Sequence, residues 1–126
     1  MSQVRIGILG TTSWGTTLAI ILARQGMDVC LWTRTQNEAA NLLSNGQNRR
    51  FLPDVPFPPS LCISSDNDEA FSDRDLVVVA VPSKSFRDNI KMVSQSLNGS
   101  AILVSATKGL ESMSGKRMTQ ILLEEL

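Results

Sequence analysis

The sequence predicts a single α/β domain built on a doubly wound parallel sheet, and three observations support this. Short apolar runs rich in branched residues alternate with segments of helical periodicity. A glycine-containing turn from Gly10 to Gly15 lies between the first apolar run and the first helical segment. The 126 residues, 42% of them hydrophobic, are enough for one buried core. Right-handed crossovers between such strands would cover both faces of the sheet with helices.

Five apolar runs are expected to form the strands. Each is short, and most are bounded by glycine, proline or polar residues, as buried parallel strands are. The strongest is DLVVVAV, which Pro82 closes. The five expected strands are Val4 to Leu9, Asp28 to Thr33, Leu61 to Ser64, Asp75 to Val81 and Ala101 to Ser105.

Helical periodicity fills most of the intervals between these runs. The first helix carries apolar residues at Trp14, Leu18 and Ile21, and Gly26 ends it. Residues 47–60 are the exception, because four prolines there exclude a helix and predict an extended connection. The other expected helical segments are Glu38 to Leu43, Asp66 to Ser72, Phe86 to Leu97 and Gly115 to Leu126.

Charge and composition exclude several classes of function. Twelve basic and twelve acidic residues cancel, so the sequence does not indicate binding to nucleic acid or to an anionic membrane. No apolar run approaches the roughly 20 residues of a membrane span, and no leader precedes Val4, so we expect a cytoplasmic protein. Histidine and tyrosine are absent, which leaves lysine as the leading candidate for proton transfer.

The two cysteines, Cys30 and Cys62, both lie in expected strands. Their spacing fits neither a metal-binding knuckle nor a CxxC redox motif, and we expect no metal site. We therefore expect two reduced thiols in the core, with a disulfide between them as the open alternative.

The glycine turn is the leading candidate for a binding site, because ligands of open parallel sheets bind beyond the carboxyl ends of the strands. Gly10 permits a tight exit from the first strand, and Gly15 lets the next helix lie close to the sheet. The amides that open this helix would face a diphosphate. Thr12 stands where the G-x-G-x-x-G fingerprint has its middle glycine, so a purely structural turn is the alternative.

The residue after the second expected strand bears on the kind of nucleotide. An acidic residue there would accept the ribose hydroxyls of NAD. This chain has Arg34 instead, and a guanidinium pairs with a 2′-phosphate and stacks on adenine. Arg34 therefore favours NADP, or tolerance of both cofactors, over a merely solvated arginine.

Five short motifs occur in order between Gly10 and Glu111. They read GTTSWGTTLA from Gly10, LWTR from Leu31, NRRFLP from Asn48, AVPSKSFR from Ala80 and SATKGLE from Ser105. Together they resemble the N-terminal nucleotide-binding domain of NAD(P)-dependent glycerol-3-phosphate dehydrogenases, and SWG and KGLE are the most specific pieces. Thr12 departs from that family's glycine.

The resemblance implies a Rossmann-like fold and roles for individual residues. Lys108 would bind the substrate and help polarise the reacting oxygen. Phe86 would pack either beside the nicotinamide or in the core, and Phe51 either beside the adenine or in the core. The implied cofactor-binding residues are Gly10, Thr12, Ser13, Trp14, Gly15, Arg34, Pro82, Ser83 and Lys108.

The resemblance also implies an activity, the interconversion of dihydroxyacetone phosphate and sn-glycerol 3-phosphate with NAD(P)H, which supplies glycerophospholipid precursors. Residues 1–126 would be the NAD(P)-binding domain, with the helical domain that carries the main catalytic lysine absent. We therefore expect little turnover by this chain and, from the apolar surface left uncovered, a homo-oligomer. Two alternatives stay open: a non-catalytic nucleotide-binding module, and another two-domain dehydrogenase of the ketopantoate reductase or 6-phosphogluconate type.

Overall fold

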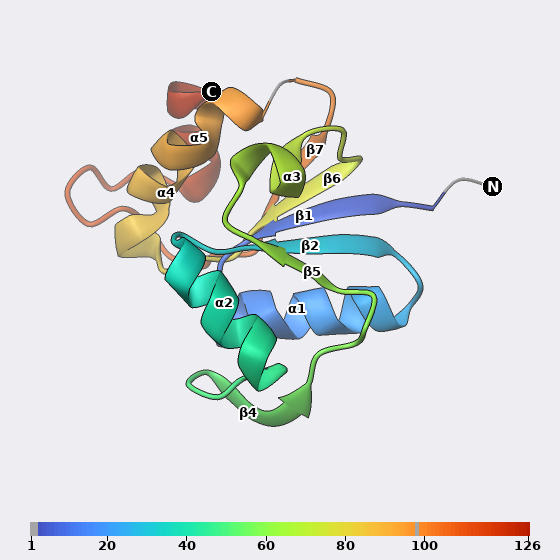
Figure 1. Cartoon of the computed structure of the whole chain (residues 1–126). Coiled ribbons are helices and arrows are strands. Elements are labelled where there is room, and N and C mark those ends of the chain that lie inside the picture. The colour runs from blue at the N-terminus through green and yellow to red at the C-terminus, as the bar shows by residue number, and fades with distance from the viewer. Residues whose placement is uncertain (1–2, 98) are drawn as a thin grey trace.

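The computed structural model describes residues 3–97 and 99–126 and confirms the expected sheet (Figure 1). Five parallel strands lie in the order β5-β2-β1-β6-β7. This order places the first strand at the centre, with the chain winding outward in both directions, as doubly wound sheets require. The strands are β1 (Arg5–Leu9), β2 (Asp28–Trp32), β5 (Cys62–Ser64), β6 (Leu76–Val79) and β7 (Ile102–Ser105).

Helices cover both faces of the sheet (Figure 1). One face carries α1 (Ser13–Arg24) and α2 (Gln36–Asn45). The other face carries α3 (Asn67–Phe71), α4 (Phe86–Val93) and α5 (Met118–Glu125). Two 3-10 turns, η1 (Ser83–Ser85) and η2 (Ser94–Ser96), flank α4. Across residues 3–97 and 99–126, no helix has both the length and the apolar character needed to cross a membrane.

Each face of the sheet has its own apolar core. Ile6, Ile8 and Ile20 belong to the core beneath α1 and α2. Phe71, Phe86 and Ile90 belong to the core beneath α3, α4 and α5. Alternate residues of β1 and β2 enter opposite cores, which explains why these strands are apolar throughout rather than alternating.

The proline-rich connection is more ordered than the sequence indicated. It contains a two-stranded antiparallel ribbon of β3 (Gln47–Asn48) and β4 (Leu52–Pro56), with Gln47 opposite Pro56 and Asn48 opposite Leu52. Proline is tolerated because a two-stranded ribbon has open edges, where a missing N–H costs no ladder bond. Side chains then complete the turn, as the Gln47 side chain accepts a hydrogen bond from the Asp54 amide at 2.8 Å.

Two elements near the carboxyl end of the chain are shorter than expected. β6 ends at Val79, two residues before Val81. α5 begins at Met118, because Gly115 has a φ of 72° and the Gln120 side chain accepts a hydrogen bond from the Arg117 amide at 2.8 Å. The residues that follow β6, Ala80 and Val81, border the candidate site.

Candidate functional site

Three neighbouring hollows form a groove that runs from the carboxyl ends of the parallel strands to α2 and the β3–β4 hairpin. The lysine hollow, of about 580 Å³, is lined by Thr12, Trp14, Ala80, Val81, Pro82, Ser83, Ala106, Thr107 and Lys108. The turn hollow, of about 210 Å³, is lined by Gly10, Thr11, Thr12, Trp32, Arg34, Val81, Pro82, Ser85 and Asn89. The hairpin hollow, of about 480 Å³, is lined by Thr11, Glu38, Asn41, Leu42, Asn45, Asn48, Arg49, Arg50 and Phe51. Neighbouring hollows share Thr11 or Thr12, so the start of α1 lies at the centre of the groove.

The floor of the groove is a backbone contact between two strand ends. Gly10 has a φ of 136°, and a Cβ built on it would lie 2.2 Å from the Ala80 carbonyl oxygen. A Cβ on Gly15 would lie 2.0 Å from the Gly10 carbonyl oxygen. Both glycines are therefore required by close approach, and they bring α1 down onto the sheet at the end of β1.

The start of α1 lacks a side-chain cap. Within the described residues, the Thr12 side chain makes no capping hydrogen bond, and the first turn of α1 holds no acidic residue. The first amides of a helix have no partners within the helix, and its dipole places partial positive charge there. The Thr12 side chain borders both the lysine and turn hollows. The helix start is therefore suited to an anion held between these hollows.

A buried asparagine fixes the glycine turn from the side of the hairpin. Asn48 is 3% exposed, and its side-chain amide donates to the Thr11 carbonyl at 2.7 Å and to the Thr16 hydroxyl at 2.9 Å. The Asn48 side-chain oxygen accepts from the Phe51 amide at 3.3 Å. One side chain therefore joins β3, the glycine turn and α1, because its donors and acceptor are all used within the core.

A threonine joins the loops that follow β6 and β7. The Thr107 hydroxyl donates to the Val81 carbonyl at 2.8 Å and accepts from the Val81 amide at 3.1 Å. It also lies 3.3 Å from the Val79 carbonyl oxygen. Thr107 thereby holds the segment carrying Lys108 beside the segment carrying Pro82.

Lys108 itself is exposed and follows this anchored threonine. Within the described part of the chain, no acidic side chain forms an ion pair with it. Gly109, with a φ of 102°, turns the chain immediately afterwards, beside the Ser83 side chain. The ammonium is therefore free to meet an anion in the lysine hollow.

An arginine on α4 holds the far end of the Lys108 loop. Arg87 binds both carboxylate oxygens of Glu111, with nitrogen–oxygen distances of 2.8 and 2.9 Å, and also pairs with Glu124 and Glu125 of α5. Hydrogen bonds from Arg87, then from Ser114, lower the pKa of Glu111 from 4.5 to about 2. The loop from Thr107 to Glu111 is thus fixed at both ends.

Comparison with known proteins decides the family. A model of the NAD-dependent glycerol-3-phosphate dehydrogenase N-terminus matches residues 5–126. This chain belongs to that family. A glycerol-3-phosphate dehydrogenase (NAD(P)+) of Thioalkalivibrio sulfidiphilus is 42% identical over 126 residues, 100% of this chain and 38% of that protein. One from Pseudoalteromonas translucida is 40% identical over 121 residues, 96% of this chain and 36% of that protein.

A solved structure gives the same result for the fold. The crystal structure of glycerol-3-phosphate dehydrogenase from Coxiella burnetii superposes with a TM-score of 0.89 at 31% identity, covering 98% of this chain and 38% of that chain. The family resemblance read from the five motifs is therefore confirmed. The chain spans 36–38% of the length of these relatives.

Most residues that the motifs of the dehydrogenase family single out lie along the groove. Trp14, Ser83 and Lys108 line the lysine hollow, and Gly10 and Arg34 line the turn hollow. Thr12 and Pro82 line both hollows, whereas Gly15 is buried beneath Gly10. Gly10 and Lys108 are 98 positions apart in the sequence, yet both lie at the carboxyl edge of the sheet.

Three other motif residues have specific positions. Ser13 donates its hydroxyl to the Phe51 carbonyl at 3.0 Å and lies outside the lining of the three hollows. Phe86 is fully buried in the core beneath α4, which settles its packing in favour of the core. Phe51 is half-buried and lines the hairpin hollow, where the Arg50 guanidinium lies 4.8 Å from its ring centroid.

Sequence reasoning did not assign roles to Asn48, Thr107 or the Arg87–Glu111 pair. All four residues fall inside the family motifs, as the first residue of NRRFLP, the threonine and glutamate of SATKGLE and the arginine of AVPSKSFR. Their presence in the motifs was the sequence feature that could have marked these four residues as candidates for a role in the groove. Their role is to position the loops of the groove, which only the three-dimensional contacts display.

Proposed function

We propose that this chain is the NAD(P)-binding domain, residues 1–126, of a glycerol-3-phosphate dehydrogenase. The main support for this proposal is the start of α1, which has no side-chain cap and no acidic residue in its first turn. This helix start lies between the lysine hollow and the turn hollow. A diphosphate between these hollows would receive the free amides of α1. The Thr12 side chain borders this space in place of the family's glycine, so the residues present fit the group with a threonine hydroxyl beside it.

The two ends of a dinucleotide would meet different residues. Arg34 borders the turn hollow, and its guanidinium supplies planar donors for a 2′-phosphate and a surface for adenine. Pro82 and Ser83 border the lysine hollow, where the nicotinamide end would lie. The proposal therefore favours NADP(H), with NAD(H) bound more weakly.

The reaction is reversible hydride transfer between the nicotinamide cofactor and C2 of dihydroxyacetone phosphate, giving sn-glycerol 3-phosphate. The bound cofactor supplies the hydride, and the protein orients the ring against the carbonyl. The Lys108 ammonium binds this phosphate substrate and stabilises negative charge on the reacting oxygen. A cytoplasmic location and the supply of phospholipid precursors belong to the same proposal.

The chain alone is expected to turn over little, because Lys108 is the titratable side chain in the lining of the lysine hollow and would have to serve both substrate binding and proton transfer. We also expect self-association through exposed apolar residues such as Ile102, Met113 and Leu123, which are 67%, 96% and 82% exposed. Sedimentation across a wide concentration range tests this, and a single monomeric species throughout would exclude self-association.

Calorimetric titration of the chain with NADPH and NADH tests the binding proposal. We expect both to bind, NADPH more tightly, and Arg34→Leu to remove most of the difference. Arg24→Leu is the matched control, because Arg24 is an exposed arginine in the last turn of α1, away from the groove. Absence of binding by either nucleotide would refute the proposal and favour a degenerate module.

Activity is measured separately by oxidation of NADPH in the presence of dihydroxyacetone phosphate. We expect no detectable oxidation by this chain. In a longer protein of this sequence that is active, Lys108→Met is expected to lower kcat/KM by about 100-fold or more, as loss of an oxyanion donor does. An unchanged kcat/KM would remove Lys108 from the mechanism.

A further inference from the structure

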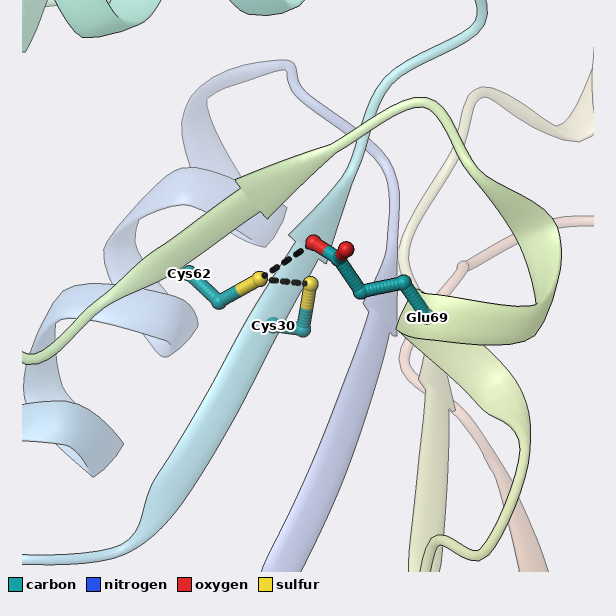
Figure 2. Close-up of side chains that lie close together, drawn as sticks. All are labelled: Cys30, Cys62 and Glu69. Carbon is teal, nitrogen blue, oxygen red and sulfur yellow. Dashed lines mark hydrogen bonds between the residues drawn. The ribbon is translucent and has the colours of Figure 1, made fainter.

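Two cysteines meet on the sheet face opposite α1. Cys30 of β2 and Cys62 of β5 are register partners in adjacent parallel strands. Figure 2 shows their side chains pointing toward each other, with the two Sγ atoms 2.6 Å apart. Both are free thiols in the structure. Neither residue lines any of the three hollows of the groove.

The backbone permits a covalent bond at this position. Neighbouring strands lie about 4.8 Å apart, and register partners project their side chains to the same face. Disulfides span Cα–Cα distances of roughly 4.4–6.8 Å, so no strand would need to move. The sequence left a disulfide between these cysteines open, and the strand pairing now shows that the two residues are direct neighbours although 31 residues separate them.

The two sulfurs have different surroundings. Cys30 is fully buried, whereas Cys62 is half-buried and lies 3.3 Å from an Oε atom of Glu69, an exposed residue of α3. A hydrogen bond from Cys30 lowers the pKa of Cys62, and the Arg74 charge acts in the same direction, against the opposite effects of burial and of the Glu69 carboxylate. The hydrogen bond with Cys62 and burial raise the pKa of Cys30. Cys62 is therefore the thiol that ionises first and that a reagent reaches first.

A metal site is the competing interpretation, because Cys30, Cys62 and Glu69 place three donor atoms within 4.8 Å of one another. Two thiolates on a tetrahedral zinc ion, each about 2.3 Å from the metal, lie roughly 3.8 Å apart. The two sulfurs are closer than that, so their contact favours a bond between them over shared ligation.

We propose that Cys30 and Cys62 form a reversible dithiol–disulfide pair that reacts with hydrogen peroxide. The Cys62 thiolate attacks the peroxide, forming Cys62 sulfenic acid and releasing hydroxide, which takes up the proton lost from the thiol. The Cys30 thiol then attacks the sulfenic sulfur, forming the disulfide and releasing water. One peroxide is reduced to water and two thiols are oxidised, and an external dithiol reverses the change.

The disulfide would connect β5, an edge strand, to its neighbour β2. The loop that it closes contains Arg34, α2, β3 and β4, and therefore most of the lining of the hairpin hollow. Oxidation would tether this wall of the groove covalently while leaving the Lys108 wall untouched. This consequence does not depend on which nucleotide, if any, the groove binds.

Intact mass and thiol counting test the pair directly. The reduced chain is treated with a slight excess of hydrogen peroxide, unfolded, alkylated and weighed. We expect a loss of two hydrogen atoms, no alkylated cysteine, full recovery with dithiothreitol and a Tm higher by on the order of 10 °C for the oxidised form. Two alkylatable thiols remaining after treatment, or a disulfide between two chains, would overturn the proposal.

Single variants assign the two steps. Cys30→Ser is expected to retain a Cys62 sulfenic acid that dimedone traps, whereas Cys62→Ser should leave Cys30 unreactive until the chain unfolds. Trapping on Cys30 in Cys62→Ser would overturn the assignment. Where either variant fails to fold, the mass measurement on the unmodified chain decides alone. Retention of one Zn²⁺ with both thiols still alkylatable after peroxide would identify a metal site and refute the redox pair.

Discussion

The two edge strands of the sheet differ in how completely the described chain covers them. On β5, Ile63 is 7% exposed, because α2 and α3 pack nearby. On β7, Ile102 and Val104 are 67% and 39% exposed, and the strand packs on the core through Leu103, beside Ala101, which precedes the strand. The side of the groove near Arg34 and the β3–β4 hairpin therefore lies next to an edge strand that helices cover. The side that carries Lys108 follows an edge strand that is packed on one face.

The loops of the two walls show the same contrast. Asn48 is 3% exposed, and buried contacts hold the glycine turn in place. Lys108 is exposed, and its loop is held at its ends by Thr107 and Glu111. One wall is therefore held by buried contacts and the other by contacts at the two ends of an exposed loop, so substitutions in the two walls should change the unfolding free energy by different amounts.

The largest effect is expected where the walls meet. Gly10→Ala combines an unfavourable φ of 136° with a backbone clash 2.2 Å from the Ala80 oxygen, and should destabilise the fold by about 3 kcal/mol or more. Gly26→Ala is the control, because its φ of 88° is similarly unfavourable but nothing lies within 4 Å, so about 1 kcal/mol is expected. Urea unfolding measures both, and equal losses would show that the close approach at Gly10 has no cost.

The edge strands themselves give the next largest difference. Ile63→Ala should cost about 2–4 kcal/mol, since it removes a buried side chain from the core beneath α2. Measured at a protein concentration at which the chain is monomeric, Ile102→Ala, at 67% exposure, should change the unfolding free energy by about 0.5 kcal/mol or less. A cost for Ile102→Ala close to that for Ile63→Ala would mean that something covers β7 in solution.

Substitutions of Asn48 and Thr107, the two side chains whose hydrogen bonds hold the walls of the groove, should differ less in their effect on the unfolding free energy. Asn48→Ala leaves the Thr11 carbonyl and the Thr16 hydroxyl without their buried partner and should cost about 2 kcal/mol. Thr107→Val keeps the side-chain shape, removes the hydrogen bonds with Val81 and should cost about 1 kcal/mol. The denaturation midpoints of the two variants rank these contacts, and a larger loss for Thr107→Val would reverse the comparison.

The smallest effect concerns the pH dependence of the Lys108 loop. The pKa of Glu111 is lowered from 4.5 to about 2, so its pairing with Arg87 stabilises the fold fully above pH 4.5 and is lost as the pH falls toward 2. Glu111→Gln should therefore unfold at lower urea than the unchanged chain at pH 6, with the difference shrinking as the pH falls. A difference that stays constant from pH 6 to pH 2.5 would show that the ion pair does not contribute.

The order of the main elements along the chain could be predicted from the sequence, because the physics is local there. The buried face of α1 could not, since Trp14 and Ile21 are 52% and 47% exposed, whereas the small residues Gly15, Thr16 and Ala19 are buried together with Ile20 and Ala23. Buried parallel strands are apolar on both faces, and glycine or proline marks their ends, so five strands were placed within one or two residues of their bounds. The family motifs also placed the residues of the groove, since Trp14, Arg34 and Lys108 all lie at the carboxyl edge.

The contacts that hold the groove together could not be predicted, because they join distant segments. Nothing local in NRRFLP shows that Asn48 bonds to the turn at Thr11, and strand pairing alone brings Cys30 to Cys62. The ribbon of residues 47–56 was missed for a similar reason, since prolines exclude a helix but do not exclude pairing at an open edge.

The bonding of Thr107 to both polar groups of Val81 has a consequence for motion. The Thr107 hydroxyl donates to the Val81 carbonyl and accepts from the Val81 amide, so it fixes one loop to the other. The backbone at Val81 is thus held next to the contact between Gly10 and Ala80, whereas the exposed Lys108 side chain can change its rotamer. If the groove binds a nucleotide as proposed, we expect the backbone at its base to stay in place and the Lys108 side chain to reorient.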